Sequence, residues 1–142
     1  MDLPYILLAE DDPNDEERLR KAFLLANPEL DIVPVSDGPT LMAYLNECAE
    51  LPALLLIDYD LPLMNAEKVL EEMFHKGQYR QVLKFVWSSS DNEEYSARCK
   101  KLGALNYFHK PSTPHELFEI VSYLSKSLYR HWLGAKPESK RP

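Results

Sequence analysis

Five short, mostly apolar runs alternate along the chain with longer segments in which apolar residues recur every three or four positions. The runs comprise residues 5–9, 31–35, 53–57, 83–87 and 104–108, and each has the length of a buried strand. The intervening segments, residues 13–26, about 39–48, about 66–76, 91–102 and 113–133, have the period of an amphipathic helix. This alternation predicts an α/β fold, a doubly wound five-stranded parallel sheet with right-handed crossovers and helices on both faces.

Local signals mark where several helices begin and end. Pro13 and the acids after it are typical of a first helical turn, and Asp91 has the side chain of an N-cap. Gly77 and Gly103 stand just past two helical segments, as glycine commonly does. The run 53–57 is the most apolar, so we expect it at the centre of the sheet.

Length and charge narrow the class of protein. The 142 residues suit one domain, which we assign to residues 1–133, followed by a flexible C-terminal tail at 134–142 that shows no periodicity. A hydrophobic content of 45% is enough to build a core. The net charge of -7 disfavours binding to a phosphate backbone or to an anionic membrane, so neither nucleic acid nor membrane is an expected partner.

Several kinds of site are excluded by what the sequence lacks. The four glycines are too far apart for a glycine-rich nucleotide loop. The four histidines and two cysteines form no zinc-binding motif and no disulfide framework. The longest apolar runs have five residues, far fewer than a membrane span requires. We therefore expect a soluble, reduced, cytoplasmic protein.

Polar side chains follow four of the five predicted strands. Glu10 and Asp11 follow the first, Asp58 the third, Ser88 the fourth and Lys110 the fifth. In a flavodoxin-like strand order these strand ends meet at one edge of the sheet. Carboxylates that lie so near one another need a compensating cation. Oxygen donors without His or Cys favour Mg²⁺. Together with the hydroxyl and the ammonium, this edge predicts a phosphoryl-binding pocket in which Asp58 is the nucleophile.

These residues form an ordered set with specific spacing. The set is Glu10-Asp11, Asp58-x-x-Leu61-Pro62, Ser88, Tyr107 and Lys110-Pro111, with 47 positions from Asp11 to Asp58, 30 from Asp58 to Ser88 and 22 from Ser88 to Lys110. In this pattern the chain resembles the receiver domain of bacterial two-component response regulators, from about residue 3 to residue 133. The resemblance implies the (βα)5 flavodoxin-like receiver fold with strand order 2-1-3-4-5.

The resemblance also implies how the site is used. Asp58 would accept a phosphoryl group from a histidine kinase or a histidine phosphotransfer protein. The carboxylates of Glu10, Asp11 and Asp58 and the backbone carbonyl of Asp60 would hold Mg²⁺, the implied cofactor. Asp60 also occupies a position that receivers vary to tune the lifetime of the phosphoryl group, and the sequence leaves the sign of its effect open.

Further roles concern the phosphoryl oxygens and the response to them. Ser88 and Lys110 would bind those oxygens, and Ser88 and Tyr107 would form the switch. The Lys110–Pro111 peptide bond would be cis, as it usually is in receivers. Ala66 departs from the family, which usually has glycine there, and this puts the geometry of the preceding loop in question.

Other interpretations stay open. Asp12, directly before Pro13, is more typical of a helix N-cap than of a metal ligand, and Tyr107 could equally be ordinary strand packing. The stretch Asp58-Tyr59-Asp60 also matches the D-x-D motif of haloacid-dehalogenase-type phosphatases, although that family places its nucleophile after the first strand. A degenerate receiver that never accepts phosphate is a third alternative, against which the intact acceptor residues argue.

The resemblance leads to an expectation about output. Because few residues follow the last predicted helix, we expect a stand-alone receiver that catalyses at most its own phosphorylation and dephosphorylation. Its effect would then pass to another protein through the surface formed by residues 91–102, 104–108 and 113–133. A homodimer stays an open alternative.

Overall fold

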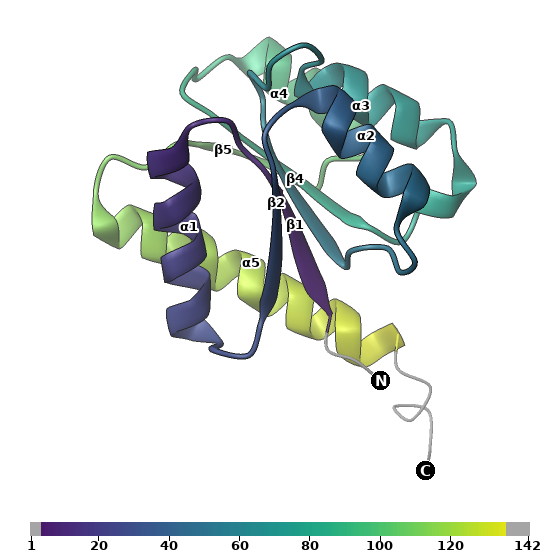
Figure 1. Ribbon diagram of the computed structural model, residues 1–142. Coiled ribbons are helices and arrows are strands. Elements are labelled where there is room, and N and C mark those ends of the chain that lie inside the picture. Colours follow the sequence, from purple (N-terminus) through teal and green to yellow (C-terminus); the bar gives the residue numbers. More distant parts are fainter. Residues whose placement is uncertain (1–3, 136–142) are drawn as a thin grey trace.

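A parallel sheet lies at the centre of the molecule in the computed structural model, which describes residues 4–135 (Figure 1). Its strands are β1 (Tyr5–Ala9), β2 (Asp31–Val35), β3 (Leu54–Asp58), β4 (Leu83–Ser88) and β5 (Asn106–His109). Their order is β2-β1-β3-β4-β5, and every neighbouring pair is parallel. The predicted fold class and strand order are therefore confirmed.

Helices cover both faces of this sheet. Within residues 4–135 they are α1 (Pro13–Ala26), α2 (Gly38–Glu47), α3 (Ala66–Phe74), the short 3₁₀ helix η1 (Gly77–Tyr79), α4 (Glu93–Lys101) and α5 (Pro114–Ala135). Figure 1 shows α1 and α5 packed together on one face and α2, α3 and α4 on the other. The molecule is thus a three-layer sandwich whose strands all end at the same edge.

Strand alternation divides the core into two parts. The first, under α2, α3 and α4, contains Leu7 and Ala9 of β1 and Leu55 and Ile57 of β3. The second, under α1 and α5, contains the intervening residues Ile6, Leu8, Leu54 and Leu56. All eight side chains are fully buried. β3 is therefore buried on both faces, as expected for the strand predicted at the centre.

α4 begins later than predicted. Its N-cap is Asn92 rather than Asp91, because Oδ1 of Asn92 accepts hydrogen bonds from the backbone amides of Glu94 and Tyr95. This helical phase buries Cys99 and packs Tyr95 against the same core. Asp and Asn are equally favourable N-cap residues, so capping preference does not distinguish Asp91 from Asn92. Packing of the helix decides between them.

Other element bounds shift by one or two residues. α3 ends at Phe74, before the predicted stop at Gly77, and β5 begins at Asn106. α5 extends to Ala135, two residues past the boundary that we set at residue 133. The rest of the predicted tail, residues 136–142, lies outside the described residues.

Candidate functional site

Three carboxylates converge where β1 and β3 end. The two strands are neighbours, Glu10 and Asp11 follow β1 directly, and Asp58 is the last residue of β3. Each of the three offers a carboxylate oxygen, and these oxygens lie within 4.8 Å of one another. Glu10 and Asp58 are buried, whereas Asp11 is exposed to solvent. The structure thus brings together the three residues that we predicted as metal-binding carboxylates.

The buried carboxylate of Glu10 has three cationic or N–H partners. Its Oε1 accepts a 2.9 Å hydrogen bond from Nε1 of Trp87 and lies 3.1 Å from Nζ of Lys110. Its Oε2 accepts a 3.0 Å hydrogen bond from the amide of Asp12. Burial raises the pKa of Glu10 to about 7, with the Asp58 carboxylate adding to this and the Asp12 amide and the Lys110 ammonium opposing it. A cation at this edge would stabilise the ionised form.

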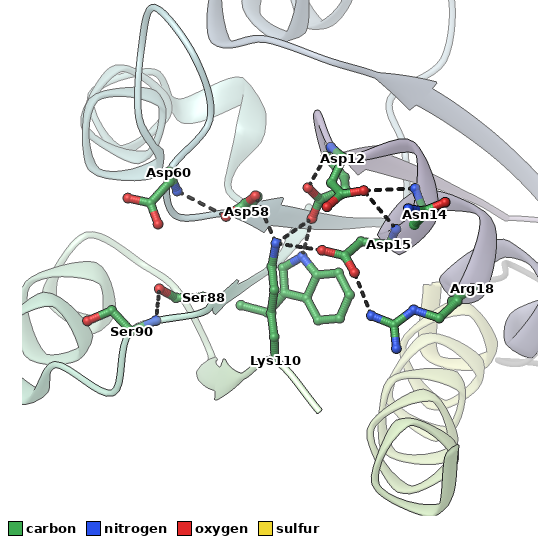
Figure 2. A network of polar contacts seen from close by, with 11 residues as sticks. Asp12, Asn14, Asp15, Arg18, Asp58, Asp60, Ser88, Ser90 and Lys110 are labelled. Atoms are coloured by element: carbon green, nitrogen blue, oxygen red, sulfur yellow. Dashed lines mark hydrogen bonds and ion pairs between the residues drawn. The ribbon is translucent and has the colours of Figure 1, made fainter. Parts of the chain in front are cut away.

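Lys110 supplies a positive charge to the cluster. Its Nζ lies 3.0 Å from Oδ2 of Asp58 and 3.0 Å from Oδ2 of Asp15, and Figure 2 shows it between them. Nζ is also 5.1 Å from the centre of the Trp87 ring, within cation–π range. Burial acts against the charged form, but the surrounding carboxylates raise the pKa of Lys110, so the side chain is an ammonium at neutral pH.

Asp58 is held from both sides. Its Oδ2 accepts from Lys110, and its Oδ1 accepts a 3.0 Å hydrogen bond from the backbone amide of Asp60. Only 4% of Asp58 is exposed, whereas Asp60 is exposed at the surface. The amide contact fixes the carboxylate at the strand end, and each of its oxygens keeps a further lone pair for a ligand or an electrophile.

The backbone at Lys110 continues the sheet beyond β5. Its amide donates a 2.7 Å hydrogen bond to the carbonyl of Ser88, so the chain at the end of β5 lies beside the chain at the end of β4. The peptide bond to Pro111 is trans, like every peptide bond in residues 4–135. The predicted cis bond is therefore wrong. Trans is the intrinsically preferred isomer, and here it coexists with the contacts of Lys110 to the site.

Ser88 and Tyr107 lie on the α4 side of the sheet, where Tyr107 packs against the core under α2, α3 and α4. Ser88 is fully buried, and its Oγ accepts a 3.0 Å hydrogen bond from the amide of Ser90 (Figure 2). The half-buried Tyr107 donates a 3.4 Å hydrogen bond to the carbonyl of Ser90. Among residues 4–135, no hydrogen bond joins Ser88 to Asp58. Both predicted switch residues therefore meet at Ser90 rather than at the acceptor.

Asp12, in contrast, caps a helix. Its Oδ1 accepts hydrogen bonds from the backbone amides of Asn14 and Asp15, and it is the N-cap of α1. Its carboxylate does not belong to the group formed by Glu10, Asp11 and Asp58. The N-cap interpretation of Asp12 is thus the one that the structure supports.

Sequence reasoning missed two residues of the site, Asp15 and Trp87. Asp15 stands four positions after Asp11, about one helical turn into α1, and its carboxylate reaches Lys110. Trp87 pairs with Asp58 in the register of β3 and β4, and its N–H reaches Glu10. The position of Asp15 one turn after Asp11 was the one sequence signal, and the contact of Trp87 depends on a strand register that the sequence does not specify.

The loop between β3 and α3, residues 59–65, packs tightly on the start of α2. The amide of Gly38 donates a 3.1 Å hydrogen bond to the carbonyl of Pro62, and a Cβ at Gly38 would lie 2.2 Å from Cβ of Met64. Leu63 has φ of 69° and is exposed, although glycine is the residue that tolerates this conformation best. Ala66, which replaces the glycine usual in receivers, is fully buried as the first residue of α3. The loop therefore accommodates the alanine without a break in the helix.

The donor set of the cluster fits a hard divalent cation. It consists of carboxylate oxygens alone, and these lie close enough to share one ion. Two of the three carboxylates are buried and repel each other. Without a metal ion, this repulsion is offset by the Lys110 ammonium and by protonation of Glu10, whose pKa is raised. A divalent metal would relieve that repulsion directly.

Comparison with known proteins assigns a family. The sequence matches the family described as response regulator receiver domain over residues 6–122. It is 26% identical to the response regulator Rcp1 of Synechocystis sp., over 82% of each chain. The crystal structure of the phosphorylated cyanobacterial phytochrome response regulator RcpA superposes with a TM-score of 0.83 at 27% identity, covering 90% of this chain and 95% of that one. The bacteriophytochrome response regulator AtBRR gives a TM-score of 0.71 at 26% identity, covering 88% and 94%.

No helix in residues 4–135 combines the length and the apolar character that crossing a bilayer requires.

Proposed function

The chain belongs to the response regulator receiver domain family, and we propose that Asp58 accepts its phosphoryl group from a histidine kinase or a histidine phosphotransfer protein. As a receiver homologous to response regulators over most of both chains, the protein is a phosphoacceptor of two-component signal transduction. The observation that carries the assignment to Asp58 is the 3.0 Å contact between its Oδ2 and Nζ of Lys110, beside two further carboxylates.

The transfer is a displacement at phosphorus. One carboxylate oxygen of Asp58 forms a bond to phosphorus while the bond between phosphorus and the donor's imidazole nitrogen breaks. The electron pair of the broken bond stays on that nitrogen, and the ring leaves as neutral imidazole because the donor's other ring nitrogen carries a proton. The product is an aspartyl phosphate, with its new negative charge on the phosphoryl oxygens.

Two side chains are placed to bind these oxygens. Lys110 already lies beside Asp58 and needs only to turn an N–H toward the new group. Ser88 uses its Oγ as an acceptor for the Ser90 amide, and its hydroxyl also carries a proton that can be donated to a phosphoryl oxygen. Movement of Ser88 toward the phosphoryl group would alter its contact with Ser90, to which Tyr107 is also bonded. This shared contact supports Ser88 and Tyr107 as the switch.

We assign the metal to Mg²⁺. The carboxylates of Glu10, Asp11 and Asp58 would hold it, together with the backbone carbonyl of Asp60, whose amide already contacts Asp58. When bound, the ion supplies neutralisation of charge on the phosphoryl oxygens. The chain's own contribution is to keep two of the carboxylates buried and ordered at the strand ends.

The output surface that we propose is the face formed by α4, β5 and α5. Tyr107 belongs to β5, and Tyr123 of α5 is exposed while its ring edge packs on Phe108. A downstream protein is the occupant we favour, and a second copy of this chain is the alternative. We place both the phosphoryl transfer to Asp58 and the binding at the output surface in the cytoplasm, where histidine kinases present their phosphohistidine.

Amide exchange with and without beryllofluoride and Mg²⁺ tests the output surface. We expect altered exchange across residues 91–133 when the phosphoryl mimic binds. Changes confined to residues 10–12 and 58–66 would contradict the assignment. Sedimentation of the same two states separates a homodimer from a monomer that acts on another protein.

The phosphatase interpretation finds no support in the fold, because Asp58 follows the third strand rather than the first. We propose no catalysis beyond the protein's own phosphorylation and dephosphorylation. Steady turnover of a generic phosphate ester would contradict this.

Intact-mass measurement after treatment with acetyl phosphate and Mg²⁺ tests the function itself. The wild type should gain one phosphoryl group, and Asp58→Asn should gain none, because an amide is not a nucleophile here. Asp31→Asn, which removes an exposed carboxylate at the start of β2, the end of the sheet opposite the site, is the matched control and should still be labelled. Absence of labelling in the wild type would support the degenerate receiver instead.

A further inference from the structure

The ammonium of Lys110 has a partner that the receiver motif does not include. Oδ2 of Asp15 lies 3.0 Å from Nζ, the same distance as Oδ2 of Asp58, while Oε1 of Glu10 lies at 3.1 Å. The ammonium donates hydrogen bonds to Asp15 and Asp58 and also forms an ion pair with Glu10. In Figure 2, Asp58 and Asp15 flank Nζ on opposite sides.

Asp15 is itself held in place. It lies in the first turn of α1, where a negative charge is favourable, and its Oδ1 accepts a hydrogen bond from Arg18. Its side chain is only 13% exposed. Burial alone would raise its pKa, but the hydrogen bonds from Arg18 and Lys110 keep the pKa of Asp15 below the ordinary value, so the carboxylate is ionised at neutral pH.

Phosphorylation changes what Lys110 has to bind. When Asp58 forms its bond to phosphorus, the negative charge moves outward from the carboxylate to the phosphoryl oxygens. Lys110 must then turn an N–H toward those oxygens, while Asp15 pulls it toward α1. A charged acceptor already in place competes for the same donors, and charge-assisted hydrogen bonds are the stronger kind.

We propose that Asp15 is a positioning residue that competes with the phosphoryl oxygens for the Lys110 ammonium and so weakens the phosphorylated state. This inference rests on the proposed function of Asp58 and adds a residue that sets how firmly the phosphoryl group is held. Asp15 acts through Lys110, because it is Lys110 that contacts both Asp15 and Asp58.

The test is the affinity for beryllofluoride at saturating Mg²⁺, followed by fluorescence titration. Asp15→Asn keeps an oxygen that can accept from Lys110 but removes the charge, so we expect the dissociation constant to fall on the order of fivefold. Asp15→Glu keeps the charge and should stay within about twofold of the wild type. Glu17→Gln removes an exposed charge from the same helix, where within residues 4–135 its ion pair is with Lys21. It should also stay within about twofold.

Salt separates competition from long-range repulsion. Near 1 M salt the Debye length falls to about 3 Å, so repulsion of the anion by a distant charge is screened, whereas a direct, largely buried contact persists. We expect the gain in Asp15→Asn to survive at that salt concentration. A gain that disappears there, an equal gain in Asp15→Glu, or no gain at all would overturn the proposal. If the wild type does not bind beryllofluoride, the proposed function fails instead.

Discussion

Nε1 of Trp87 donates a 2.9 Å hydrogen bond to Oε1 of Glu10, which joins two residues 77 positions apart in the sequence. Both side chains are buried, and the bond fixes the carboxylate on β1 from a strand two places away in the sheet. The same ring lies under Nζ of Lys110. Trp87 therefore contacts both the carboxylate of Glu10 and the ammonium of Lys110.

This relationship predicts the effect of Trp87→Phe, which keeps an aromatic ring but removes the N–H. A buried acceptor that loses a donor costs about 1–3 kcal/mol, so the free energy of unfolding should fall by that amount in urea titrations. Repeating the substitution in a Glu10→Ala background, which removes the acceptor, should show coupling of about 0.5 kcal/mol or more, because the two side chains are in contact. Additive effects would contradict the contact.

A second prediction concerns pH. Folding raises the pKa of Glu10 from its ordinary 4.5 to about 7, so between these values the folded chain binds more protons than the unfolded chain. The contribution of Glu10 to stability therefore falls as pH rises through that range. Binding of Mg²⁺ needs the ionised carboxylate, so Mg²⁺ affinity should increase roughly tenfold from pH 6 to pH 8 and then level off.

Calorimetric titration of Mg²⁺ at pH 6, 7 and 8 checks this profile. Glu10→Gln is the control, since it removes the titrating group and should flatten the dependence. A wild-type affinity that does not change over this range would show that protonation of Glu10 does not limit metal binding.

A third prediction concerns the loop that follows the acceptor. In Gly38→Ala the new methyl group would lie 2.2 Å from Cβ and 2.3 Å from the carbonyl oxygen of Met64, so loop 59–65 or α2 must shift. We expect a loss of about 1–3 kcal/mol in the free energy of unfolding, as for other overpacked sites. Gly77→Ala meets only the end of the Arg80 side chain at 3.5 Å and should change stability by less than about 0.5 kcal/mol. Equal effects of the two substitutions would refute the close approach.

Much of the site was predictable because parallel strands end at one edge. The alternation of runs placed Glu10, Asp58 and Lys110 at the ends of three strands of one parallel sheet. The spacing between these residues matched a known motif. These are properties of sequence order and sheet topology, which do not depend on the orientation of any single side chain.

The contacts of Asp15 and Trp87 depend on orientation instead. Trp87 lies on the α1–α5 side of the sheet, with Leu8 and Leu56. Because side chains alternate along a strand, Glu10 lies on the same side as Leu8, two positions before it. The Trp87 N–H can therefore reach Glu10. This becomes visible only once the register of β4 is known. Asp15 reaches Lys110 because the first turn of α1 lies beside the chain that follows β5, and the periodicity of a single helix does not specify this placement.

Two errors have local causes. The trans bond before Pro111 reflects a small intrinsic difference between isomers that neighbouring contacts decide. The later start of α4 reflects a choice between Asp91 and Asn92 that depends on which phase buries Cys99.

The central claim is that Asp58 is the phosphoacceptor, and chemical mapping of the phosphorylated residue tests it most directly. The protein would be treated with acetyl phosphate and Mg²⁺, reduced with borohydride, which converts an aspartyl phosphate to homoserine, and digested for peptide mass spectrometry. We expect homoserine at position 58 and unmodified aspartate at Asp11, Asp12, Asp15 and Asp60. Homoserine at one of those four positions, with Asp58 intact, would contradict it.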